Sequence, residues 1–319
     1  MNRLGFSQWL VAKENPLTAR VAVNRLWKVC FGEGLVRTVN DFGTQGEPPT
    51  HPELLDWLAV SFQESGWDVK AMLRLIVSSR TYQQESSIRK AGVSTYDPQN
   101  RLLSRGPAFR LSAEMIRDQA LAVSGLLRRQ LGGPSVKPYQ PPGMWEEVSY
   151  NQEDSYVEET GDGLWRRSVY TYLKRQMPPP SFLAFDGTTR EKCTVHRART
   201  NTPLQSLILL NDPTYVEAAR SLAMLVLRTV ADENERVEAI FRRILCRAPD
   251  ADESKLLIEL LHRQQKRFPS DTDAALKLVS TGASNIPDTL TDQIERTELA
   301  AWTIVAHTIL NLDEAITRR

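Results

Sequence analysis

Residues 199–220 read RTNTPLQSLILLNDPTYVEAAR and contain a polar entry followed by an apolar run. Thr202 lies three residues before Gln205, which is the spacing of a capping box at a helix N-terminus. Pro203 suits the first helical position because that position needs no backbone N–H donor. The stretch therefore predicts a short helix that begins at Pro203.

The same stretch ends in an Asn-Asp-Pro break. We expect Asn211 to close the first helix in a left-handed conformation and Asp212 to cap a second helix from Pro213. The polar residues are thus predicted to be structural caps: Thr202, Gln205, Asn211 and Asp212.

Caps followed by apolar stripes recur along most of the chain. They predict helices after Asn15, Thr50, Asp68, Asp97 and Ser112, the last of these running to about residue 132. Further helices are expected at 213–230, 233–246, 252–267, 273–280 and 295–311. Residues 166–175 (RRSVYTYLKR) fit a short strand and a helix equally well. We predict a mainly α protein, with roughly half or more of its residues in helix against the usual third.

The helical pattern fails between residues 134 and 164, where proline, glycine and acidic residues are frequent. Such a segment is typical of a linker or a long functional loop. We expect two packed helical lobes, 1–133 and 165–319, joined by the irregular segment 134–164. One compact domain overall is the alternative.

The formal charges almost cancel, because 40 Lys and Arg face 39 Asp and Glu for a net charge of +1. This balance gives no general attraction to nucleic acid or to an anionic membrane. No apolar run could span a bilayer, and no secretory signal opens the chain. Taken alone, these features favour a cytosolic protein. An apolar stripe is already present at the start, however, which suits the tail of a longer polypeptide: Leu4, Trp9, Leu10 and Val11.

The cysteines and histidines lack the spacing of a metal or haem site. Cys30 and Cys246 lie in apolar helical surroundings and are expected in the core. Cys193 stands near several positively charged side chains, which could lower the pKa of its thiol. Because the sequence places no general base beside it, a non-catalytic role is favoured. His307 is expected to be a buried core residue. The other histidines, His51, His196 and His262, are dispersed, so no metal and no cofactor are expected in this chain.

Basic residues gather in the irregular stretch that leads into the helix at Pro203. A helix N-terminus favours anions, so Arg190, Arg197, Arg199 and Asn201 form a candidate site for an anion or a partner. The competing hypothesis, which the balanced charge favours, is internal pairing with an acidic segment. In that case Arg197, Arg199 and Asn201, with Thr202 and Gln205, pin the loop 186–201 to the helix that begins at Pro203. The acids concerned are Glu146, Glu147, Glu153, Asp154, Glu158 and Glu159.

Three long stretches resemble one protein family. They are ENPLTARVAVNRLWKVCFGEGLVRTVNDFGTQGEPPTHPELLDWLA (14–59), RRSVYTYLKRQMPPPSFLAFDGTTREKCTVHRARTNTPLQSLILLNDPTYVEAAR (166–220) and ELAAWTIVAHTILNLDEAITRR (298–319). The family is the planctomycete-specific C-terminal domain of unknown function, found in large planctomycete cytochrome-c-like proteins. The resemblance implies an extracytoplasmic location and an upstream or separate haem-binding module. It supplies no catalytic residues. Cys30 stands where a histidine is common in the family, and His196 where an arginine is common.

Two kinds of function remain open on these grounds. The leading hypothesis is a non-catalytic helical scaffold or binding module that docks a partner domain or a polymer such as extracellular polysaccharide. The alternative is an enzyme acting on polysaccharide with a site in residues 134–200. An electron-transfer subunit is a third reading, in which this chain would be an accessory to a haem protein.

Overall fold

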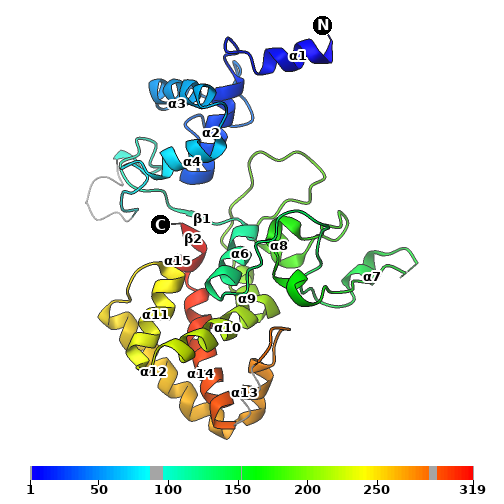
Figure 1. The fold of residues 1–319 in the computed structure, drawn as a ribbon, viewed down its shortest axis with the longest axis vertical. Coiled ribbons are helices and arrows are strands. Elements are labelled where there is room, and N and C mark those ends of the chain that lie inside the picture. The colour runs from blue at the N-terminus through cyan, green and yellow to red at the C-terminus, as the bar shows by residue number, and fades with distance from the viewer. Residues whose placement is uncertain (1, 87–95, 152, 287–292, 319) are drawn as a thin grey trace. The chain divides into compact units, whose positions relative to one another are not determined.

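The computed structural model describes residues 2–86, 96–151, 153–286 and 293–318. Helices account for 54% of the chain as described, and strands form one two-stranded sheet, so the mainly α prediction is confirmed. The chain divides into two compact units, residues 1–110 with 317–319 and residues 111–316. Figure 1 shows their elements.

The first unit packs three helices around an aromatic core. Trp27 stacks on Phe31 with ring centroids 4.2 Å apart. The buried amide of Asn24 binds both backbone groups of Val36 at 2.9 Å and so holds the loop after α2. Phe109 pairs with Arg318, which ties the chain end to this unit. Its elements are α1 (Arg3–Leu10), α2 (Thr18–Phe31), α3 (Pro52–Glu64), α4 (Val69–Val77), β1 (Phe109–Arg110) and β2 (Thr317–Arg318).

One helix predicted in this unit does not form. Asp97 caps a turn instead, because its carboxylate accepts from the amides of Arg101 at 2.7 Å and Leu102 at 2.8 Å. Asn100 and Leu103 have positive φ, which an α-helix does not allow. Asn15 accepts from the amides of Leu17 and Thr18, but the N-cap position of α2 is Leu17, so this helix begins two residues later than predicted.

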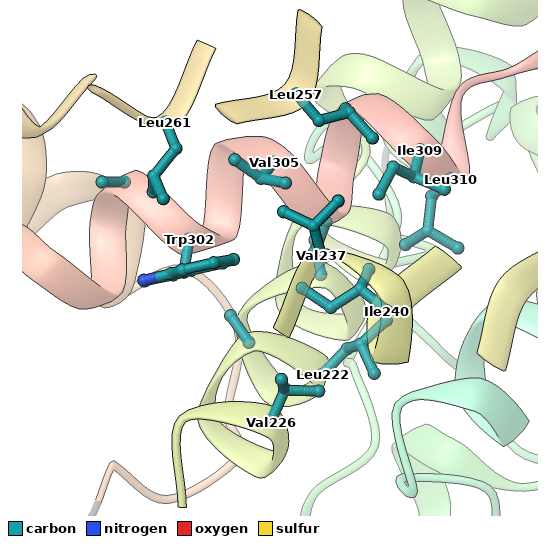
Figure 2. Close-up of a cluster of buried hydrophobic side chains, with 14 of the residues drawn as sticks. Leu222, Val226, Val237, Ile240, Leu257, Leu261, Trp302, Val305, Ile309 and Leu310 are labelled. Atoms are coloured by element: carbon teal, nitrogen blue, oxygen red, sulfur yellow. The ribbon is translucent and has the colours of Figure 1, made fainter. Parts of the chain in front are cut away.

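The second unit is built around α14 and α10. Figure 2 shows side chains of α10, α11 and α12 gathered around Trp302, Val305 and Ile309 of α14. Its longer helices are α6 (Ala113–Val123), α9 (Pro203–Asn211), α10 (Pro213–Thr229), α11 (Glu233–Leu245), α12 (Ala251–Arg267), α13 (Thr272–Val279) and α14 (Gln293–Leu310). Its shorter elements are α7 (Met144–Val148), η1 (Gly161–Trp165), η2 (Ser168–Tyr170), α8 (Pro180–Ala184), η3 (Phe268–Ser270) and α15 (Asp313–Ile316).

The division between the units lies before α6, whereas the sequence suggested a linker at 134–164. The apolar face of α6 explains the difference, since Ile116 and Ala120 pack with Tyr215 and Ala218 of α10. α6 ends at Val123, earlier than predicted. The segment 134–164 therefore lies within the second unit.

Residues 166–175 form neither a strand nor an α-helix. They contain η2 and residues of three isolated bridges, in one of which Thr171 pairs with Val136. The irregular segment and this stretch are thus held together by backbone hydrogen bonds.

The cysteine prediction holds for Cys30, which is buried, and is wrong for Cys246. Cys246 is exposed because it ends α11 in a left-handed conformation with φ of 60°. His307 is buried as predicted, and its Nε2 lies 2.7 Å from the carbonyl oxygen of Leu209. No helix in the described parts of the chain has the length and apolarity needed to cross a bilayer.

Candidate functional site

The loop between α8 and α9, residues 187–201, stands away from the helices of the second unit (Figure 1). Its two ends are joined at the base. Asp186 accepts hydrogen bonds from the amide of Thr200 at 2.7 Å and from its hydroxyl at 3.0 Å. Asp186 adopts a positive φ of 59°, which turns the chain outward after α8. Loops with closed ends of this kind are frequently functional.

Gln205 anchors the base of this loop to the body of the unit. Its side chain is 1% exposed, and its Nε2 donates to the carbonyl oxygens of Ala184 at 2.8 Å and Thr200 at 3.2 Å. Its Oε1 accepts from the amide of Thr202 at 3.3 Å, and together they form the capping box that starts α9. One amide side chain thus joins α8, the loop and α9.

The junction between α9 and α10 is capped by Asp212. Its carboxylate accepts from the amide of Thr214 at 2.8 Å, and burial raises the pKa of this carboxyl above its usual value. Asn211 differs from the prediction, because it remains in the last turn of α9 and does not adopt a positive φ. Its side-chain amide donates back to the carbonyl of Leu207 at 2.7 Å.

The loop is strongly basic for its length. It carries Arg190, Lys192, Arg197 and Arg199 against one acid, Glu191, a surplus of three positive charges in a chain whose net charge is +1. The candidate residues Arg190, Arg199 and Asn201 are exposed, whereas Arg197 is half-buried.

Arg197 fastens the loop to α6. Its guanidinium donates to the carboxylate of Glu114 at 2.7 Å. Burial opposes ionisation of Glu114, but the hydrogen bond and charge of Arg197, together with hydrogen bonds from the backbone amide of Glu114 itself and from Ser112, outweigh burial and hold the pKa of that carboxyl below its usual value. This partner was missed from the sequence, where the acidic segment was expected to supply the pair. Within that segment, Asp154 pairs with Lys174 at 2.6 Å.

Two buried arginines organise the irregular chain before the loop. Arg117 of α6 donates to the carbonyl oxygens of Leu164 at 2.6 Å and Arg166 at 3.0 Å. The guanidinium of Arg166 donates to the carbonyl of Pro134 at 2.9 Å and lies 3.9 Å from the ring centroid of Tyr170. These guanidinium groups replace the backbone ladders that regular secondary structure would supply.

A fully buried carboxylate joins three parts of the unit. Glu217 of α10 accepts from the indole Nε1 of Trp165 at 3.0 Å and from the amide of Ser284 at 2.5 Å. Arg220 lies 3.8 Å from the same carboxylate and donates to the carbonyl of Val279 at 2.6 Å. The contacts of Glu217 with Trp165 and of Arg220 with Val279 could not be read from the sequence, since these partners lie more than fifty residues apart along the chain.

In the described residues, no three His, Cys, Asp or Glu side chains gather so as to hold a metal ion. Comparison with protein families matches residues 2–261 to PSD1, a protein of unknown function (DUF1553). The chain belongs to this family. The match agrees with the resemblance to a domain of unknown function. No curated protein and no solved structure matches the chain.

Proposed function

We propose that this chain is a non-catalytic binding module that docks an anionic partner through the loop 187–201. The observation that carries the proposal is the construction of this loop. Its base is closed by Asp186, Thr200 and Gln205, while Arg190, Lys192 and Arg199 lie exposed along it. The protein thus displays positive charge on a loop whose ends are fixed.

Fixed ends matter for affinity. A loop that is already closed loses less conformational entropy on binding than a free chain of the same length. The ion pair between Arg197 and Glu114 fixes a further point within the loop. The other basic residues can then bind an anionic polymer with little further loss of conformational entropy. Binding also releases counterions from both surfaces.

The partner is proposed to be an extracellular polysaccharide that bears carboxylate or sulfate groups. The resemblance to the C-terminal domain of large planctomycete cytochrome-c-like proteins supports an extracytoplasmic location and a haem-binding module upstream or in a separate chain. Repeated acidic groups on a polymer suit a loop that carries several cations.

Contacts in residues 134–200 favour binding over the enzymatic alternative. Burial raises the pKa of the tyrosine hydroxyls of Tyr139 and Tyr156 in this region. Both hydroxyls are engaged in the fold, since Tyr156 donates to the carbonyl of Pro138 at 2.5 Å and Tyr139 accepts from the amide of Ala283 at 2.7 Å. The two hydroxyls whose pKa is raised are therefore part of the hydrogen bonding that holds the fold together.

Retention on immobilised dextran sulfate tests the proposal, with neutral dextran as the reference matrix. A variant with Arg190→Ala, Lys192→Ala and Arg199→Ala should elute at clearly lower salt than the parent protein. The matched control removes the same charge from exposed positions on α12, through Lys255→Ala, Arg263→Ala and Lys266→Ala. Equal retention of both variants would contradict the proposal, and so would equal retention of the parent on neutral dextran.

A further inference from the structure

Three aromatic rings meet where the irregular segment 134–164 pairs with residues 166–175. Trp145 of α7 lies edge-to-face with Tyr156, with centroids 5.1 Å apart, and its ring is 5.7 Å from that of Tyr172. Trp145 is 7% exposed, whereas Tyr172 is 41% exposed. The group therefore has a buried floor and one side near the surface.

An ammonium group from the same chain occupies the space between these rings. Lys137 Nζ lies 4.9 Å from the centroid of Trp145, 5.9 Å from that of Tyr156 and 5.8 Å from that of Tyr172. All three distances lie within the range of a cation–π interaction. Lys174 Nζ also approaches the Trp145 ring, at 4.5 Å, but it is held by Asp154 at 2.6 Å.

Lys137 has no such acidic partner. In the described part of the chain its ammonium forms no ion pair within 4.0 Å, and it lies over the three rings. The side chain is half-buried. A lysine held by rings alone can leave for water readily, because its flexible stem reaches the surface and its ammonium is strongly hydrated.

The surroundings of the rings favour a cation. Residues 143–165 contain seven acidic residues and no basic ones. Burial raises the pKa of the Tyr156 hydroxyl, and the negative charges of Glu158 and Glu159 add to this effect, although the positive charge of Arg117 opposes it. Beside Trp145, the buried Oε2 of Glu146 has no hydrogen-bond partner among the residues that the structure describes. An anionic ligand would be repelled here, whereas a cation would be attracted.

We propose that Trp145, Tyr156 and Tyr172 form an aromatic cage for a small soluble compound that carries a trimethylammonium group, and that Lys137 fills this cage when the ligand is absent. A quaternary ammonium spreads its charge over methyl groups and is weakly hydrated, so it gains more from ring faces than a primary ammonium does. Ligand binding displaces the Lys137 side chain into solvent. The cage takes a cation, so it is independent of the anion-binding loop.

Calorimetric titration with tetramethylammonium and with choline tests the proposal. Lys137→Ala removes the internal competitor and should bind about tenfold more tightly than the parent protein. Tyr172→Ala removes the most exposed ring and should weaken binding by about tenfold, while Tyr172→Phe keeps the ring and should restore it. The control Lys255→Ala removes an exposed lysine on α12 and should bind like the parent.

A neutral ligand of the same shape shows how much of the binding depends on the positive charge of the ligand. 3,3-Dimethylbutan-1-ol replaces the ammonium nitrogen of choline by carbon, and it should bind about tenfold or more weakly than choline. Circular dichroism spectra of the variants establish that each is folded. A folded Lys137→Ala protein that binds neither tetramethylammonium nor choline would overturn the proposal. Equal binding of choline and its neutral analogue would also overturn it.

Discussion

The indole Nε1 of Trp165 donates a hydrogen bond of 3.0 Å to the carboxylate of Glu217, across 52 residues of chain. Glu217 is fully buried, and Arg220, whose guanidinium lies 3.8 Å from this carboxylate, is 1% exposed. This hydrogen bond joins the end of η1 to α10, one of the two helices around which the second unit is built. The stability of that unit should therefore depend on the Glu217 carboxylate.

Replacing this carboxylate should be costly. In Glu217→Gln the guanidinium of Arg220 stays buried without a compensating charge, and we expect the free energy of unfolding to fall by about 3 kcal/mol. Urea denaturation of the second unit measures the change. The control is Glu238→Gln, which breaks the exposed pair with Arg242 at 2.6 Å and should cost about 0.5 kcal/mol or less. Similar losses for the two variants would contradict the account.

Gly282 lies against the same carboxylate. It adopts φ of 85°, and a Cβ placed there would lie 2.5 Å from Cδ of Glu217. Gly66 has φ of 71° and nothing within 4 Å of its would-be Cβ, so it is the matched control. Gly66→Ala should cost about 1–2 kcal/mol from the left-handed backbone alone. Gly282→Ala should cost about 1–3 kcal/mol more, because the methyl group overlaps Glu217. Thermal unfolding of both variants gives the difference, and equal costs would rule out the overlap.

Gln205 should control how firmly the loop 187–201 is held. Gln205→Ala removes the donor to the carbonyls of Ala184 and Thr200 and empties a buried side-chain position, so we expect a loss of about 1–3 kcal/mol and faster tryptic cleavage within the loop. Thr202→Ala removes the other half of the capping box and should cost about 1 kcal/mol. A Gln205→Ala protein cleaved at the parental rate would show that the loop is fixed by other contacts.

Burial of His307 should make the second unit less stable in mild acid. Burial lowers the pKa of this imidazole below its ordinary value of 6.5, so the folded chain resists a proton that the unfolded chain accepts. The free energy of unfolding therefore falls as the pH drops below about 6.5, until the folded-state pKa is reached. His307→Gln should show a shallower fall than the parent between about pH 7.5 and pH 5. The control His51→Gln, in the first unit, should leave the pH dependence of the second unit's unfolding free energy unchanged. If His307→Gln also left that pH dependence unchanged, the prediction would be wrong.

Local chemistry explains what the sequence could predict. The caps at Asp68, Ser112 and Asp212 bind amides two or three residues away, so their spacing is visible in the sequence. The turn at Asp97 shows the limit of this reasoning, because its carboxylate accepts from amides four and five residues ahead and closes a turn that is not helical.

Contacts between distant residues could not be predicted. Trp165 and Glu217, or Arg117 and the carbonyl of Leu164, are brought together by the packing of α6 on α10 and not by any spacing along the chain. The partner of Arg197 was missed for the same reason. Glu114 is 83 residues away, and many other carboxylates in the sequence were equally plausible partners.

The salt dependence of binding to dextran sulfate tests the anion-binding loop most directly. Each cation that contacts the polymer releases counterions, so the logarithm of the binding constant should fall linearly with the logarithm of the salt concentration. Each such cation contributes about 0.7–0.9 to the magnitude of this slope. Removing Arg190, Lys192 and Arg199 together should therefore lower its magnitude by about 2–3. The variant lacking Lys255, Arg263 and Lys266 on α12 should keep the parental slope. If the loop variant kept the parental slope and affinity, the loop would not be the binding surface.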